Sequence, residues 1–137
     1  MRTALPSTLI CVLLLGCSQA EPPAPPAGPP YEVVADIHHM MDWILDPAAD
    51  VIWDSAGFII TAEGEQDLSP TTEDAWAHVV HNAAVVAEGG NLLMMPGRSA
   101  GEDWNEYSRG LVAAGRLAIE AAEAKDAEAL FDAGGRF

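Results

Sequence analysis

The residues of this chain with the clearest capacity for chemistry are its histidines. His78 and His81 lie three residues apart, and His38 and His39 are adjacent and are soon followed by Asp42. Imidazole nitrogens combined with a carboxylate bind zinc, copper or non-haem iron. If two helices bring these residues together, His78, His81 and His39 are the expected ligands of a divalent metal. The alternative interpretation is that they are ordinary surface or core side chains.

Cysteine chemistry is confined to the start of the chain, because Cys11 and Cys17 are its only two cysteines. The residues after Cys17 therefore cannot form a disulfide, a thiolate metal site or a thioether bond to haem. Residues 9–15 form an apolar run too short to span a bilayer, and this run leads into Gly16 and Cys17. The segment Leu14-Leu15-Gly16-Cys17 resembles the lipobox of bacterial lipoproteins.

This resemblance implies where in the cell the protein is located. It implies that residues 1–16 are a signal peptide, that Cys17 is lipidated, and that a lipid anchor holds the protein at the membrane of a bacterial cell envelope, facing the periplasm. Ser18 after the cysteine favours the outer membrane under the sorting rule of lipoproteins. The alternative is an ordinary secretory signal that is cleaved nearby.

A spacer is expected after the lipidated cysteine. Residues 21–30 consist mostly of proline, alanine and glycine, a composition that favours extended polyproline II over hydrogen-bonded structure. Residues 17–30 are therefore interpreted as the lipidated cysteine with its spacer, and residues 31–137 as one folded domain.

The distribution of charge excludes one class of partner. The chain has a formal net charge of −15, and no lysine or arginine occurs between Thr3 and Gly97. Nucleic-acid binding is therefore not expected. Within this stretch four aspartates, at positions 42, 46, 50 and 54, recur at the spacing of one helix face. They predict a solvated face or, as the sharper hypothesis, a docking surface for a cationic redox partner protein.

A first helix is predicted where apolar residues recur at steps of three and four, from Val33 to Phe58. Asp46-Pro47 interrupts this pattern. It predicts a kink, or a break in which Asp46 caps a new helix that has Pro47 at its first position. The β-branched run at 58–60 lies inside the helical pattern, so no strand is predicted there.

Three further helices are predicted downstream of a loop at 63–70. The second begins after Thr71 or Thr72 and is stopped by Gly89-Gly90. The third follows an apolar connection at 91–101, begins near Glu102, and includes Tyr107 among its inward-facing residues. Asp126 is expected to be the N-cap of a short fourth helix. The sequence thus predicts an all-α fold, an antiparallel four-helix bundle of up-down-up-down topology.

The order of several residues along the chain resembles the cytochrome c-prime type of four-helix bundle. The residues that carry this resemblance are Met40, Trp43, Pro47, Asp50 and Trp53, then Leu93-Met94 with Gly97-Arg98, then Trp104, and finally the run from Asp126 to Arg136. The resemblance covers nearly all of the predicted domain. It implies haem binding and electron transfer, with haem c as the cofactor.

The chain departs from that family at the haem-attachment motif. In the family a Cys-x-x-Cys-His at the end of the fourth helix holds haem by two thioethers and a proximal histidine, whereas this chain reaches Phe137 without such a motif. Covalent attachment is therefore impossible in the chain as it stands. Two accounts are expected to fit: a truncated haem protein, or a natural bundle that has lost covalent haem.

In low-spin members of the family a methionine of the first helix is an axial iron ligand. The resemblance thus makes Met41 the first candidate and Met40 the second, since only one of the two adjacent side chains can face the core. The residues expected to furnish an apolar pocket around the methionine are Trp43, Ile44, Trp76 and Val80. Arg98 is a candidate partner for a haem propionate. The alternative is that both methionines are plain packing residues.

An enzyme is not expected. The sequence has no Gly-x-Ser-x-Gly, no phosphate-binding glycine-rich loop after a strand, and no cysteine nucleophile in the domain. Two classes of function are left open. One is a haem-binding electron carrier, and the other is a haem-less tethered bundle that binds a divalent metal or a cationic partner.

Overall fold

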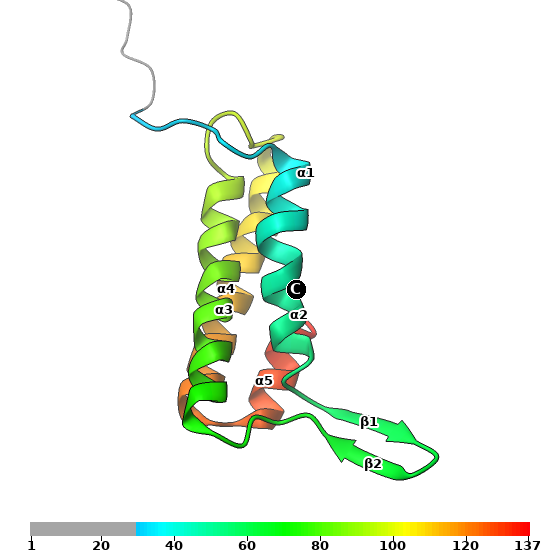
Figure 1. Cartoon of the computed structure of the whole chain (residues 1–137). Coiled ribbons are helices and arrows are strands. Elements are labelled where there is room, and N and C mark those ends of the chain that lie inside the picture. The colour runs from blue at the N-terminus through cyan, green and yellow to red at the C-terminus, as the bar shows by residue number, and fades with distance from the viewer. Residues whose placement is uncertain (1–29) are drawn as a thin grey trace, which may run out of the picture. The chain divides into compact units, whose positions relative to one another are not determined.

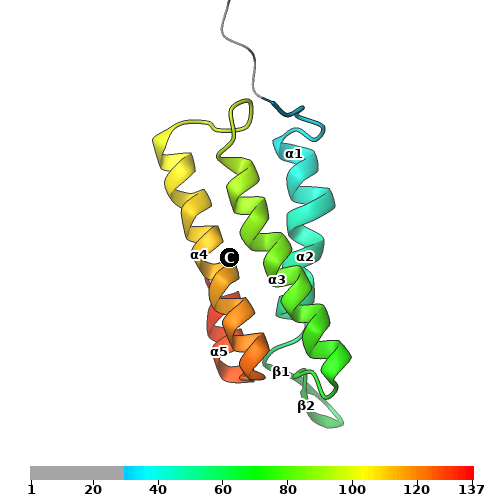
Figure 2. The same ribbon diagram turned by 90° about the vertical axis from the view of Figure 1, so that its left-hand side faces the viewer.

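A computed structural model describes residues 30–137, and residues 32–137 form one compact unit. The unit is mostly helical, as the sequence predicts, with one small β-hairpin (Figures 1 and 2). The segments predicted as a signal peptide and a spacer, together with Cys17, the predicted site of lipidation, lie almost entirely outside the described residues. Among the described helices, none has the length and apolar character needed to cross a membrane.

The first helical segment changes its hydrogen bonding just before Pro47. It comprises α1 (Ile37–Met40), the π-helical turn η1 (Met41–Leu45) and α2 (Asp46–Trp53) in direct succession. Asp46 has helical backbone angles, and Leu45 occupies the N-cap position, so the prediction that Asp46 caps a new helix is wrong. Because proline lacks an N–H and crowds the preceding turn, a wider π turn there accommodates it.

A β-hairpin replaces the predicted end of the first helix. Strand β1 (Phe58–Thr61) pairs antiparallel with β2 (Gly64–Asp67), with Phe58 opposite Asp67 and Thr61 opposite Gly64. The helical prediction for residues 58–60 is therefore wrong, and the loop prediction for 63–70 is wrong at residues 64–67, which form β2. Gly57 and Gly64 both have positive φ, at 84° and 131°. Such a conformation ends a helix and allows a tight turn, and the β-branched residues between them favour a strand.

Helix α3 (Glu73–Leu93) begins as predicted, because the Thr72 side chain accepts a hydrogen bond from the Ala75 N–H at 3.1 Å. The predicted stop at Gly89-Gly90 is wrong, since the helix continues through both residues. Each glycine lies where another chain segment approaches closely. A Cβ at Gly89 would lie 2.4 Å from Leu45 Cδ2, and one at Gly90 would lie 2.8 Å from the carbonyl oxygen of Ser108. Close packing between helices thus explains why glycine occupies both positions.

Helices α4 (Glu102–Ala124) and α5 (Ala127–Gly134) also begin where the sequence predicts. Helices α3 and α4 lie side by side along most of their lengths (Figure 2). The eight-residue α5 packs against α4 and α2, where Trp53 Nε1 donates a hydrogen bond to the carbonyl oxygen of Gly134 at 2.8 Å. Tyr107 is 79% exposed, so its predicted inward orientation is wrong.

Two apolar clusters hold these helices together. The larger joins α2, α3, α4 and α5 around Ile52, Val79, Ala118 and Leu130, each at most 1% exposed. The smaller cluster consists of Ala35, Met40, Leu45 and Leu93, and it is covered by half-buried neighbours that include Ile44 and Trp104.

We expect the N-cap of α5 to be measurable as stability. Asp126 Oδ1 accepts a hydrogen bond from the Ala129 N–H at 3.0 Å, and losing an N-cap of this type costs about 1 kcal/mol. Asp126→Ala should lower the melting temperature, whereas Asp132→Ala, an exposed change on the same helix, should have little effect. Equal effects in thermal unfolding monitored by circular dichroism would show that the cap contributes nothing specific.

Candidate functional site

An apolar groove opens beside Met41, where η1, α4 and the last residues of the chain meet. It has a volume of about 560 Å³. Its lining residues are Met41, Leu93, Trp104, Glu106, Tyr107, Ser108, Gly110, Leu111, Arg136 and Phe137. The groove therefore combines a thioether, three aromatic rings and one cation, and its size lies within the range of small-molecule sites.

The two candidate methionines have different surroundings. Met40 is 1% exposed and packs in the smaller cluster with Leu45 and Leu93. Met41 is 37% exposed and lines the groove. Met40 is thus the residue that faces the core, where it is packed among apolar side chains. Met41 is the thioether that a ligand in the groove can reach.

The four residues expected to enclose the methionine do not form one pocket. Trp76 and Val80 belong to the larger cluster, and Ile44 covers the smaller one. Trp43 is 63% exposed and stacks on the His39 ring, with ring centroids 4.1 Å apart. The expected grouping therefore fails, because the helical repeat turns Trp43 away from the side of the segment that carries Ile44.

Arg98 is occupied by the protein's own backbone. Its guanidinium is buried, and it donates hydrogen bonds to the carbonyl oxygens of Ala35, at 3.0 Å, and Leu92, at 3.4 Å. These bonds tie the connection between α3 and α4 to the chain before α1. A side chain so engaged is not free for a propionate, and the cation that lines the groove is Arg136 instead.

The histidines lie on two helices and are not gathered into a metal site. His78 and His81 are exposed on α3, whereas His39 on α1 has its Nδ1 2.9 Å from Asp36 Oδ1. The His39 backbone N–H also donates to Asp36, and this bond lowers the pKa of that exposed carboxyl. No group of three or more metal-binding side chains occurs within residues 30–137. The divalent-metal hypothesis gains no geometric support from these positions.

The four aspartates spaced along the first helical segment are all exposed. His38 Nε2 lies 3.3 Å from Asp42 Oδ2, and this exposed pair is the only contact recorded between the aspartate stripe and an ionisable partner in the described chain. The arrangement agrees with a solvated face. Docking of a cationic partner on the stripe stays a prediction.

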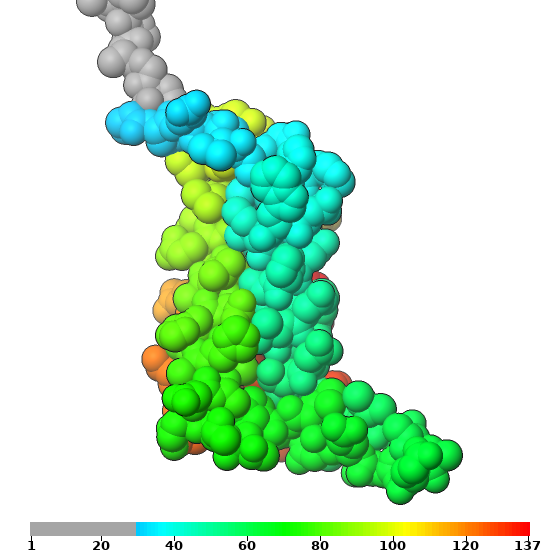
Figure 3. Space-filling model, viewed as in Figure 1, coloured from blue at the N-terminus to red at the C-terminus, as the bar shows by residue number. Residues whose placement is uncertain are grey.

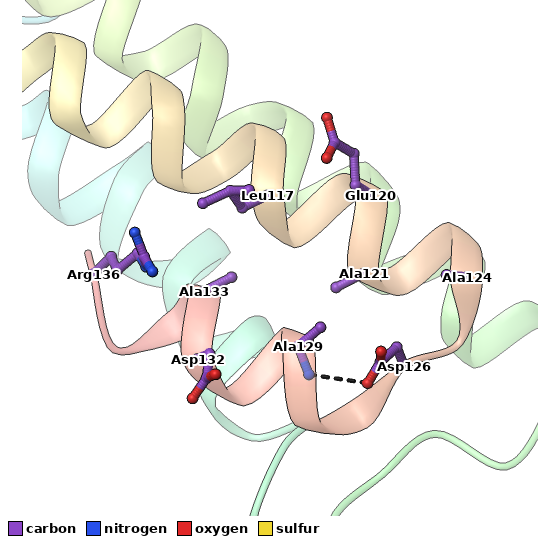
Figure 4. A pocket seen from close by; sticks show the side chains of 9 residues that line it. All are labelled: Leu117, Glu120, Ala121, Ala124, Asp126, Ala129, Asp132, Ala133 and Arg136. Carbon is purple, nitrogen blue, oxygen red and sulfur yellow. Dashed lines mark hydrogen bonds between the residues drawn. The ribbon is translucent and has the colours of Figure 1, made fainter.

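A second hollow lies in the seam between α4 and α5, and Figure 4 shows its lining side chains. Its volume is about 370 Å³, and most of its lining is alanine and acidic residues. Of these, the Asp126 carboxylate is already used to cap α5. Arg136 lines both this seam and the groove beside Met41. The seam offers no nucleophile or ligand set, so the groove is the better candidate.

Sequence reasoning missed several residues of the groove, notably Tyr107, Leu111, Arg136 and Phe137, as parts of a site. No signal in the sequence placed these residues beside Met41, because they come from segments that are far apart along the chain. Comparison with known proteins adds no guide, since no family model, no curated protein and no solved structure matches this chain.

Proposed function

We propose that this chain is a haem-binding electron carrier of the cytochrome c-prime type, in which α5 is the short fourth helix of an antiparallel bundle. The observation that carries the proposal is the apolar groove that contains the exposed thioether of Met41. The resemblance along the chain supplies the identity of the ligand. Cys17 and its lipid would anchor the protein to the bacterial envelope, with the domain facing the periplasm.

The groove suits a porphyrin held without covalent bonds. Its apolar and aromatic lining can cover the ring, the Met41 sulfur is a soft axial ligand, and Arg136 can pair with a propionate. When bound, haem would supply one-electron chemistry, and a thioether ligand raises its reduction potential. No histidine lines the groove and no thiol follows Cys17, so Met41 would be the principal iron ligand from this chain.

Helix α5 determines how much of this surface is open. It has eight residues, whereas α3 has 21 and α4 has 23. At about 1.5 Å per residue, α5 accompanies α4 for only about a third of its length. The groove lies along the N-terminal half of α4, whereas α5 borders the hollow beside the C-terminal half of α4. A flat apolar ligand would fill the position that a longer fourth helix takes in a regular bundle.

A haem titration tests the proposal. We expect the protein to bind haem with a Soret band that shifts in Met41→Ala, with affinity lowered at least about tenfold, because the thioether ligand is lost. Met95→Ala is the matched control, since Met95 lies in the connection between α3 and α4 and does not line the groove. Identical spectra and affinities for the two variants would contradict the proposed ligand.

A further inference from the structure

The β-hairpin projects from the helices (Figure 3), and it exposes apolar side chains. Phe58 is 62% exposed and Ile60 is 82% exposed. Alternate residues of a strand share a face, and cross-strand partners do so too. Phe58 and Ile60 therefore lie on one face with Asp67 and Glu65, their respective partners in the register. This face is both apolar and acidic.

At the root of the hairpin this face borders a hollow of about 630 Å³. The lining residues are Gly57, Phe58, Asp67, Ser69, Ala127, Glu128 and Phe131. Phe131 packs directly on the root, because a Cβ at Gly57 would lie 3.0 Å from its ring. Phe131 is itself 60% exposed. Two phenyl rings, one from β1 and one from α5, thus line the same open hollow.

One carboxylate at this hollow is held in place. Asp67 Oδ1 accepts hydrogen bonds from the Ser69 N–H at 2.8 Å and from the Ser69 hydroxyl at 2.6 Å. These two bonds lower the pKa of Asp67, so the group stays ionised. A second carboxylate, Glu128, lies in the first turn of α5. No lysine or arginine lines the hollow.

We propose that this hollow binds a lysine or arginine side chain presented by a basic partner protein. The faces of aromatic rings attract cations, and the attraction grows when the cation is partly removed from water. Asp67 and Glu128 supply the opposite charge, while Phe58 and Ile60 offer apolar contact around it. The inference is independent of haem, because none of the residues that line the groove beside Met41 lines this hollow.

Charge decides between a basic protein and the other occupants. The chain carries a net charge of −15. No lysine or arginine occurs between Thr3 and Gly97, a range that includes the whole hairpin. Two hairpins from two copies would therefore bring carboxylates together, which is unfavourable. An anionic lipid surface would be repelled for the same reason. A basic protein surface is the one complement that satisfies both the apolar and the acidic parts.

The test is an NMR titration of the full chain with the peptide acetyl-Arg-Val-Arg-Val-Arg-amide. We expect saturable shifts of the Gly57, Phe58 and Phe131 resonances, and none with the same peptide carrying glutamate in place of arginine. Phe58→Leu keeps an apolar strand residue but removes the ring, and Glu128→Gln removes one charge. Each should weaken binding at least fivefold. Glu123→Gln is the matched control, an identical change at an exposed glutamate of α4 that lies outside the hollow, the groove and the aspartate stripe, and it should alter affinity less than twofold.

Three results would overturn the inference. Equal weakening by Glu123→Gln and Glu128→Gln would mean that the peptide responds only to the net charge of the protein. Co-sedimentation with phosphatidylcholine vesicles that depends on Phe58, without peptide shifts at the hollow, would assign the surface to a membrane. Concentration-dependent shifts at Phe58 in the protein alone, again without a peptide response, would assign it to a second copy. Circular dichroism of each variant verifies that the helices are intact.

Discussion

Leu130→Ala should lower the free energy of unfolding by about 2–5 kcal/mol, the usual cost of truncating a fully buried leucine. Leu130 is 0% exposed and lies in the larger apolar cluster, where α5 meets α2 and the fully buried Ile52. The cost should be large because α5 has only eight residues, so it depends on packing rather than on its own helical propensity.

Urea unfolding measures this effect, with the midpoint shifting and the slope unchanged if unfolding stays two-state. The matched control is Leu117→Ala on α4, where the leucine is 41% exposed. We expect the control to cost well under half as much, since less apolar area is lost from burial. Comparable losses in the two variants would mean that α5 is not anchored through Leu130.

The second large effect is expected at Gly115, where α4 approaches the backbone of α3 closely. A Cβ at Gly115 would lie 2.8 Å from the Ala87 backbone nitrogen and 3.0 Å from the Ala83 carbonyl oxygen. Because backbone atoms cannot turn aside as a flexible side chain can, Gly115→Ala must push the two helices apart. Overpacking of this kind costs about 1–3 kcal/mol. The variant should therefore unfold at clearly lower urea concentration.

Gly110→Ala provides the control on the same helix. Nothing lies within 4 Å of a Cβ built at Gly110, so alanine there should stabilise the protein by up to about 1 kcal/mol through its higher helix propensity. The two substitutions are chemically identical and should have opposite signs. If both stabilise the protein, the close approach of α3 and α4 at Gly115 is not a constraint on the fold.

The helix starts were predictable from sequence because their signals are local. Thr72 and Asp126 each cap the first turn of the helix that follows them, and an N-cap needs only residues within one turn. The end of α3 was not predictable in this way. Gly89-Gly90 stops a helix by propensity, yet Leu45 and Ser108 approach these glycines from other parts of the chain. Tertiary packing overrides the local preference there.

The hairpin was missed for a different reason. Phe58, Ile59 and Ile60 can continue a helical pattern or begin a strand, and the turn that decides between them depends on Gly57 and Gly64 with positive φ. The candidate site was predictable only as far as Met41. The rest of the groove comes from the end of α3, from α4 and from the residues after α5. The spacing of these segments along the chain does not predict how close they lie in space.

The hydrogen bond from Trp53 to Gly134 joins residues 81 positions apart. During synthesis, the first helical segment therefore emerges long before its partner on α5 exists. Until then the apolar side chains of α2 that pack against α5 are exposed to water, and exposed apolar surface of this kind favours aggregation. The fold is thus completed late in synthesis. Contacts between residues far apart in the sequence slow folding, and the contact between Trp53 and Gly134 is of this kind.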